Sequence, residues 1–194
     1  MIKRRISRKT LDESIESIIG VSAPTAPDMS TDEDGKKIQK TLNKLISEEI
    51  VAKDIYIGAI MAASNEEGCK FKELFAHIAK DELEDHAKNL ICWAKANGFS
   101  VPFKYADYQK FSNGDLCRIL AKIKPDQNAL QYVDMAIKSE YLAIQSYEDE
   151  LRNSAVPYEL RTILYKNLTD EKEHLDQLTT LQTTLNAEAT LYLF

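Results

Sequence analysis

Four long stretches of the sequence place apolar residues at helical spacing and contain almost no helix-breaking residues. Apolar positions recur every three or four residues, as they do on the buried face of an amphipathic helix. The whole chain has only six glycines and five prolines in 194 residues, so few positions interrupt these stretches. They cover residues 37–64, 68–97, 126–153 and 157–185. Since four apolar faces have to be buried against one another, the pattern predicts an all-α helical bundle.

The lengths of the connections predict how the four helices are arranged. Short turns join the first helix to the second and the third to the fourth, so each pair should form an antiparallel hairpin. Residues 98–125 separate the second helix from the third, and this segment is long enough to run the length of the bundle. Two hairpins joined by one long crossover are the ferritin-like arrangement. We also consider a short fifth helix in the last residues, 186–194.

The N-terminal segment differs in composition from the rest of the chain. We expect residues 1–37 to form a basic arm and linker, and residues 38–194 to form the bundle domain. Residues 2–9 of the arm carry five basic residues, Lys3, Arg4, Arg5, Arg8 and Lys9, and a stretch rich in Pro, Ser, Thr and Asp follows. The arm is either a solvated terminus, a segment that grips DNA phosphates, or a docking peptide anchored by its isoleucines.

Composition narrows the setting in which the protein works. The formal net charge of −6 argues against a protein whose whole surface is basic and binds nucleic acid. No apolar run approaches the roughly 18 residues that a membrane span needs. The three cysteines have no CxxC spacing, and their odd number argues against a pure disulfide framework. We therefore expect a cytoplasmic protein with no membrane partner.

Each helical stretch has a glutamate on its apolar face, and two stretches add a histidine. These residues are Glu49 in the first stretch, Glu82 and His86 in the second, Glu140 in the third, and Glu171 and His174 in the fourth. Burying one charged carboxylate costs roughly several kcal/mol. Two divalent cations would neutralise the charge of four such carboxylates. Oxygen and imidazole ligands without thiolate suit iron or manganese. One glutamate from each of two helices with a Glu/His pair from each of the others is the di-iron carboxylate pattern.

Each of these residues also has an ordinary explanation when taken alone. A single glutamate at the edge of an apolar stripe is usually solvated, and Glu-x-x-His occurs by chance in many helices. The agreement of all four helices at matching depth favours the metal site.

Three of the stretches resemble the bacterioferritin family. "LNKLISEEIVAKDIY", "SEYLAIQSYEDEL" and "LTDEKEHLDQL" are similar to that family's first, third and fourth helices. The resemblance implies that Glu49 and Glu140 are terminal ligands, that Glu171 bridges two metals, and that His174 is an imidazole ligand. The resemblance also matches Tyr56 to a tyrosine that lies near the metal site in that family. Tyr56 is then either an ordinary core tyrosine or a redox-active neighbour of the metals.

The second helix departs from the family pattern. In "AKDELEDHAKNL", His86 matches the family histidine, but Leu83 falls where the bridging glutamate belongs. Relative to His86, position 82 lies about 40° around the helix axis and position 83 about 60°, so both face the site and only Glu82 can ligate. Its greater reach or a π-bulge would accommodate the spacing of four; without either, Glu82 would only orient a histidine. Glu84 occupies the position of the family's haem-ligand methionine, so we expect no haem.

The resemblance implies a ferroxidase that stores and detoxifies iron. Two Fe(II) ions would bind, and O2 or peroxide would take two electrons from them. Members of such families are commonly homo-oligomers, and we expect one here. Two alternatives remain: a structural or packaged ferritin-like interaction protein with a degenerate metal site, and a rubrerythrin-like peroxide scavenger. The basic residues of the arm also resemble the basic tails of mini-ferritins of the Dps type.

Overall fold

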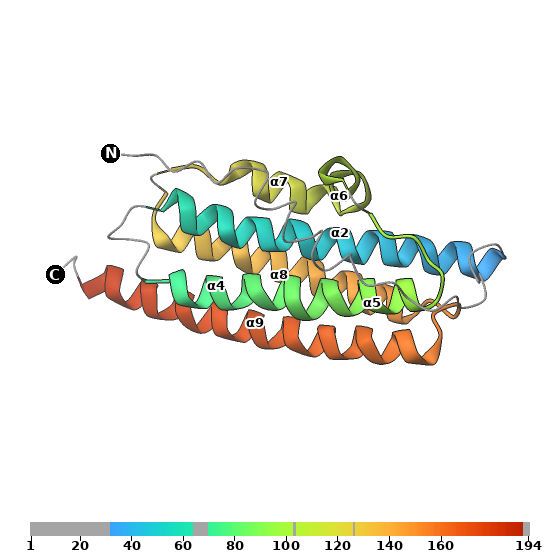
Figure 1. Ribbon diagram of the computed structural model, residues 1–194. Coiled ribbons are helices and arrows are strands. Elements are labelled where there is room, and N and C mark those ends of the chain that lie inside the picture. The colour runs from blue at the N-terminus through green and yellow to red at the C-terminus, as the bar shows by residue number, and fades with distance from the viewer. Residues whose placement is uncertain (1–31, 64–69, 103, 126, 192–194) are drawn as a thin grey trace.

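The computed structural model describes residues 32–63, 70–102, 104–125 and 127–191, and every regular element among them is a helix (Figure 1). The bundle consists of α2 (Glu33–Ala62), the run of α4 (Lys72–Asp81), η2 (Glu82–Ala87) and α5 (Lys88–Ala96), α8 (Ala129–Leu151) and α9 (Tyr158–Leu191). The predicted all-α bundle is therefore confirmed.

The connections follow the predicted pattern of two hairpins and one crossover. Figure 1 shows α2 and the α4–α5 run side by side in opposite directions, and α8 and α9 likewise. The crossover returns along the bundle and contains two short helices that the sequence analysis did not predict, α6 (Tyr105–Phe111) and α7 (Gly114–Lys122). Both pack on α2. They cover a face of α2 that would otherwise be open.

Several helix ends differ from the predicted ones, and the caps explain two of them. The first helix begins at Glu33 instead of Lys37, because the side chain of Asp32 caps it by accepting the backbone N–H of Gly35. The third begins at Ala129, behind a reciprocal capping box of Asn128 and Gln131. None of the described helices combines the length and the hydropathy needed to cross a membrane.

The short fifth helix is not a separate element. Residues 186–191 continue α9 without a break, since no glycine or proline interrupts "NAEATL". Residues 192–194 lie outside the described part of the chain, as do residues 1–31, which hold most of the expected N-terminal arm.

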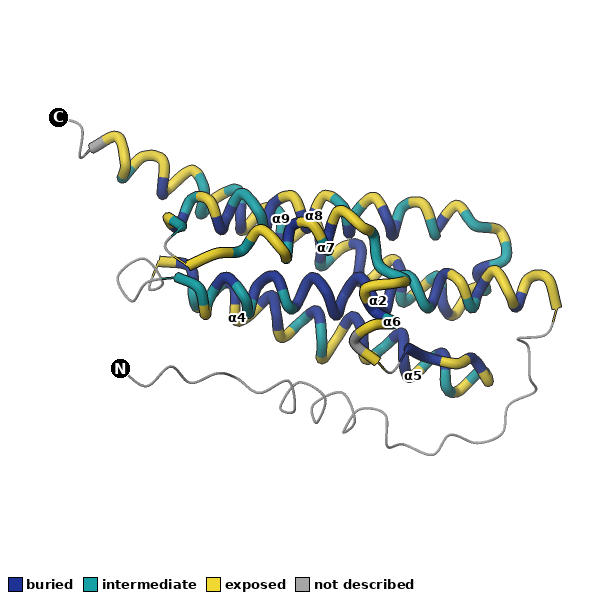
Figure 2. Tube along the Cα trace, turned by 90° about the horizontal axis from the view of Figure 1, so that it is seen from above, coloured by how far each residue is buried: buried dark blue, intermediate teal, exposed yellow. Residues whose placement is uncertain are grey.

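The core of the bundle is two apolar clusters with a charged layer between them. One cluster gathers residues from 38–55, 87–119 and 147–168, and the other gathers residues from 56–79, 129–137 and 178–185. Between them lie buried Glu and His side chains from all four long helices. Figure 2 shows how buried residues follow the inward face of each helix through this middle region. A layer of buried charge across a core is the feature that needs a chemical explanation.

Candidate metal centre

The charged layer contains the six residues that the sequence analysis selected. None of them is more than 3% exposed. They form two groups, Glu49, Glu82, His86 and Glu171 on one side and Glu82, Glu140, Glu171 and His174 on the other. Within each group the oxygen and nitrogen atoms that could bind an ion all lie within 4.8 Å of one another. Glu82 and Glu171 belong to both groups, so the layer has the arrangement of two adjoining sites that share two carboxylates.

Both imidazole rings turn the same nitrogen toward the carboxylates. Nδ1 of His86 lies 3.1 Å from Glu171 Oε1 and 3.3 Å from Glu49 Oε2. Nδ1 of His174 lies 3.7 Å from Glu140 Oε2 and 3.8 Å from Glu171 Oε2. The ring centroids are 5.7 Å apart. Each histidine can therefore offer Nδ1 to an ion in its own group.

A π-helix brings Glu82 into the layer. Residues Glu82–Ala87 form six residues of π-helix between the α-helical segments α4 and α5. A π-helical turn accommodates one extra residue, so Glu82 and His86 face the same side although four positions separate them. Glu82 is 1% exposed, and its Oε2 lies 3.4 Å from His86 Nδ1. Of the two accommodations that the sequence analysis considered for this spacing, the structure has the π-bulge. Leu83 packs against the apolar core instead.

Two aspartates that the sequence analysis did not select lie behind the histidines. Oδ2 of Asp170 is 3.3 Å from His86 Nε2, and Oδ2 of Asp81 is 3.5 Å from His174 Nε2. The contacts are reciprocal between the two hairpins. Asp81 of the first hairpin contacts His174 of the second, and Asp170 of the second hairpin contacts His86 of the first. A carboxylate at Nε2 orients the ring and leaves the Nδ1 lone pair for a metal.

Two tyrosines hold the remaining carboxylates in a similarly reciprocal way. The hydroxyl of Tyr56 donates to Glu140 Oε1, and the hydroxyl of Tyr147 donates to Glu49 Oε1. Both side chains are fully buried. Asn167 Nδ2 donates in turn to the Tyr147 hydroxyl, at 2.9 Å. Each tyrosine therefore orients a carboxylate that comes from the opposite hairpin.

The sequence contained a signal for these residues. Tyr56 follows Glu49 by seven positions, and Tyr147 follows Glu140 by the same seven. The dipeptide Asp-Glu likewise occurs before both histidines, at 81–82 and at 170–171. The two hairpins thus repeat one pattern, and comparing them with each other would have selected Tyr147, Asp81 and Asp170. Asn167 has no such counterpart, since Ile78 occupies the equivalent position before Glu82.

Burial and mutual repulsion change the acidity of the layer. Burial, together with the charge of Glu171, raises the pKa of Glu140 to about 8 and raises the pKa of Glu82 well above its usual value. Burial alone would lower the pKa of His174, but its approach to Glu140 and Glu171 raises that pKa to about 10. Without metal, the layer therefore retains protons that compensate the carboxylates, and metal binding would displace them.

The atoms that face the layer lack other partners. Both carboxylate oxygens of Glu82 and of Glu171, Oε2 of Glu140 and Nδ1 of His174 are buried and make no hydrogen bond with the described part of the chain. Buried polar atoms are rarely left in this state, because each costs about 1–3 kcal/mol. Four carboxylates and two imidazoles fit two divalent ions of the iron or manganese type in charge and in donor chemistry. The donor set thus fits a dinuclear centre.

Comparison with known proteins agrees with this fold. Residues 39–188 match the family model of the ferritin-like domain. This chain belongs to the ferritin-like family. Among solved structures, the ferritin-like fold recurs in a chain described as "ferritin like, diiron-carboxylate proteins from Bacillus anthracis str. Ames". The TM-score is 0.59 at 22% sequence identity, over 78% of this chain and 99% of that one. No curated protein matches the sequence. The nearer resemblance to bacterioferritins stays a prediction.

Proposed function

We propose that this ferritin-like protein is a di-iron ferroxidase that oxidises Fe(II) with O2 or peroxide and so stores or detoxifies iron. The observation that supports this most directly is the pair of adjoining ligand groups that share Glu82 and Glu171. A single buried ion pair would not need six buried ionisable side chains, four of which have facing atoms that make no hydrogen bond with the described part of the chain. Two metal ions would satisfy all six.

Each ligand has a distinct role in this proposal. Glu49 and His86 would hold one ion, Glu140 and His174 would hold the other, and Glu82 and Glu171, which belong to both groups, would be shared between them. Asp170 and Asp81 keep the Nδ1 atoms of the histidines directed at the ions. Tyr56 and Tyr147 hold the terminal carboxylates by hydrogen bonds. The apolar clusters on both sides limit the access of water.

Bound iron supplies the two electrons that reduce the oxidant. The protein supplies the geometry, and its carboxylates and imidazoles release their protons when the ions bind. In an oligomer with an internal cavity the oxidised iron would be stored, whereas an open dimer would only remove peroxide. We propose a homo-oligomer, with the N-terminal arm as a separate contact for DNA or a docking partner.

Metal titration tests the proposal directly. Purified metal-free protein, titrated with Fe(II) without oxygen, should bind two ions per chain at the centre. On addition of O2 or peroxide, the bound Fe(II) should oxidise far faster than free Fe(II) in the same buffer, with two Fe(II) consumed for each O2 reduced to peroxide. Less than one ion per chain would favour the structural or packaged protein with a degenerate site. Binding of two ions without oxidation would also contradict a ferroxidase.

The aspartates behind the histidines offer a second, more specific test. Replacing Asp170 with asparagine should weaken metal binding by roughly 10–100-fold, because the carboxylate that orients His86 loses its charge. Two ions should still bind at saturating concentration, since no ligand is removed. Competition with a calibrated chelator measures the affinity. Asp176→Asn is the matched control, because Asp176 is an exposed residue of the same helix, and it should leave the affinity unchanged. Equal affinity of both variants would show that Asp170 does not orient the ligand.

A further inference from the structure

A second buried carboxylate on α2 lies outside the metal centre. Glu48 is 2% exposed, although it precedes the ligand Glu49 and faces a different side of the helix. Its Oε1 accepts the backbone N–H of Asn113, at the start of α7, at 3.1 Å. Its Oε2 is buried and makes no hydrogen bond within the described ranges. One oxygen of Glu48 is thus anchored by the crossover, and the other makes no hydrogen bond of good geometry, although the Ser146 hydroxyl lies close to the carboxylate.

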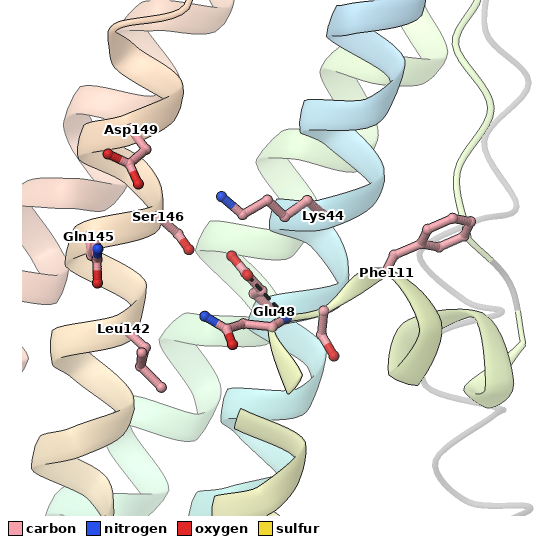
Figure 3. Close-up of a pocket in the computed structure, with 9 residues that line it drawn as sticks. Lys44, Glu48, Phe111, Leu142, Gln145, Ser146 and Asp149 are labelled. Atoms are coloured by element: carbon pink, nitrogen blue, oxygen red, sulfur yellow. Dashed lines mark hydrogen bonds between the residues drawn. The ribbon is translucent and has the colours of Figure 1, made fainter. Parts of the chain in front are cut away.

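Glu48 lines a small polar cavity. The cavity has a volume of about 220 Å³ and lies between α2, α8 and the junction of α6 and α7. Figure 3 shows Ser146 of α8 pointing across it toward Glu48 of α2, with Gln145 and Asp149 along the same side of α8. Ser112 lines it from the junction. Space for several water molecules therefore adjoins a buried, unpaired carboxylate oxygen.

The lysine that lines the cavity also forms a salt bridge with another residue. Lys44 also lines the cavity, but its Nζ lies 3.1 Å from Glu150 Oε1. The other oxygen of Glu150 accepts the hydroxyl of Thr41 at 2.5 Å, which holds that carboxylate in place for the lysine. Lys44 is therefore held in place by Glu150, and its charge also acts on the carboxylate of Glu48.

The groups around the cavity that could bind a cation are oxygens of the hard type. Two carboxylates, two hydroxyls and two side-chain amides line it beside the ammonium group of Lys44, without any thiolate or imidazole. Such donors suit divalent cations that keep part of their water shell and bind through one or two carboxylates. The di-metal centre differs, because it encloses its ions with six ligands that include two imidazoles. A cation in the cavity would be held more weakly and would exchange more readily.

We propose that this cavity is a third cation site, in which Glu48 Oε2 anchors a hydrated divalent ion outside the di-metal centre. The site follows from the cavity and from the unpaired oxygen. The identity of its ion rests on the proposed function, in which the ion is the Fe(II) substrate held next to the centre on the crossover side of α2.

Manganese counting tests the site without redox chemistry. Full-length metal-free protein is titrated with Mn(II), and free Mn(II) is followed by electron paramagnetic resonance. The expected result is two tightly bound ions and one ion bound more weakly. Glu48→Gln should loosen only the weaker ion, by roughly tenfold or more, because the amide keeps the Asn113 contact but has no charge. Glu148→Gln is the matched control: Glu148 lies on α8, pairs with Lys172 and does not line the cavity.

The two proposals fail in different ways in this experiment. Two ions in the native protein, or a third ion that binds Glu48→Gln as tightly as it binds the native protein, would overturn the third site and leave the ferroxidase proposal untouched. In Glu82→Ala, the tight ions should be lost and the weak ion kept, which supports the third site by itself. A crystal of the manganese form should show an anomalous peak beside Glu48 Oε2. An unoccupied or purely water-filled cavity at saturating Mn(II) would overturn the site.

Discussion

Replacing Glu82 with alanine should remove both metal ions from the centre, whereas replacing Glu49 should loosen mainly one of them. Glu82 belongs to both ligand groups, and Glu49 belongs to only one. The loss of a bridging charge should weaken both sites by roughly a hundredfold or more, since even the loss of an orienting partner costs 10–100-fold. Fe(II) oxidation should fall by a similar factor, because it needs two adjacent ions. Metal analysis and rapid mixing with O2 measure the two effects.

The controls separate a lost ligand from a damaged helix. Glu84→Ala changes an exposed glutamate in the same π-helix and should leave occupancy and rate unchanged. Circular dichroism should show equal helix content in all three variants. If Glu82→Ala keeps both ions and the native rate, Glu82 does not bridge, and the π-helix has some other cause.

The bundle could be predicted because its pattern is local and repeated. Helical spacing and scarce breakers defined four long helices, and one long connection defined the crossover. The candidate ligands followed from charge at apolar positions, which is costly wherever it occurs. Glu82 lies four positions before His86, one more than the spacing in the family pattern. Positions 82 and 83 both face the site by their angles around the helix axis, and Glu82 was selected because a leucine cannot bind a metal.

Other features could not be predicted because they depend on contacts between distant segments. The short helices α6 and α7 are stabilised by packing on α2, because their seven and nine residues are too few to form a stable helix alone. Whether Asn113 meets Glu48 depends on how the crossover folds back over 65 positions of sequence. The partners of the histidines come from the opposite hairpin, so a scan along single helices overlooks them.

Metal loading should raise the melting temperature strongly. Ions that bind only the folded state stabilise it by RT ln(1 + [L]/Kd), about 4 kcal/mol for one site at a thousandfold excess over Kd. In a protein of this size, 1 kcal/mol corresponds to roughly 2–4 °C. One filled site should therefore raise the melting temperature by about 8–16 °C, and a second site should add to this. Calorimetry in Mn(II) and in chelator measures the difference.

The variant Glu82→Gln turns this shift into a test of the centre itself. Burial and the charge of Glu171 raise the pKa of Glu82 well above its usual value. A carboxyl whose folded-state pKa is raised destabilises the fold as the pH rises above its unfolded value, so without metal the glutamate is a cost at neutral pH. In chelator, Glu82→Gln should therefore melt at the native temperature or higher. In Mn(II) the order should reverse, because the variant lacks the bridging charge. An equal rise in both proteins would mean that the ions bind elsewhere, since a centre bridged by Glu82 requires the two melting curves to change order.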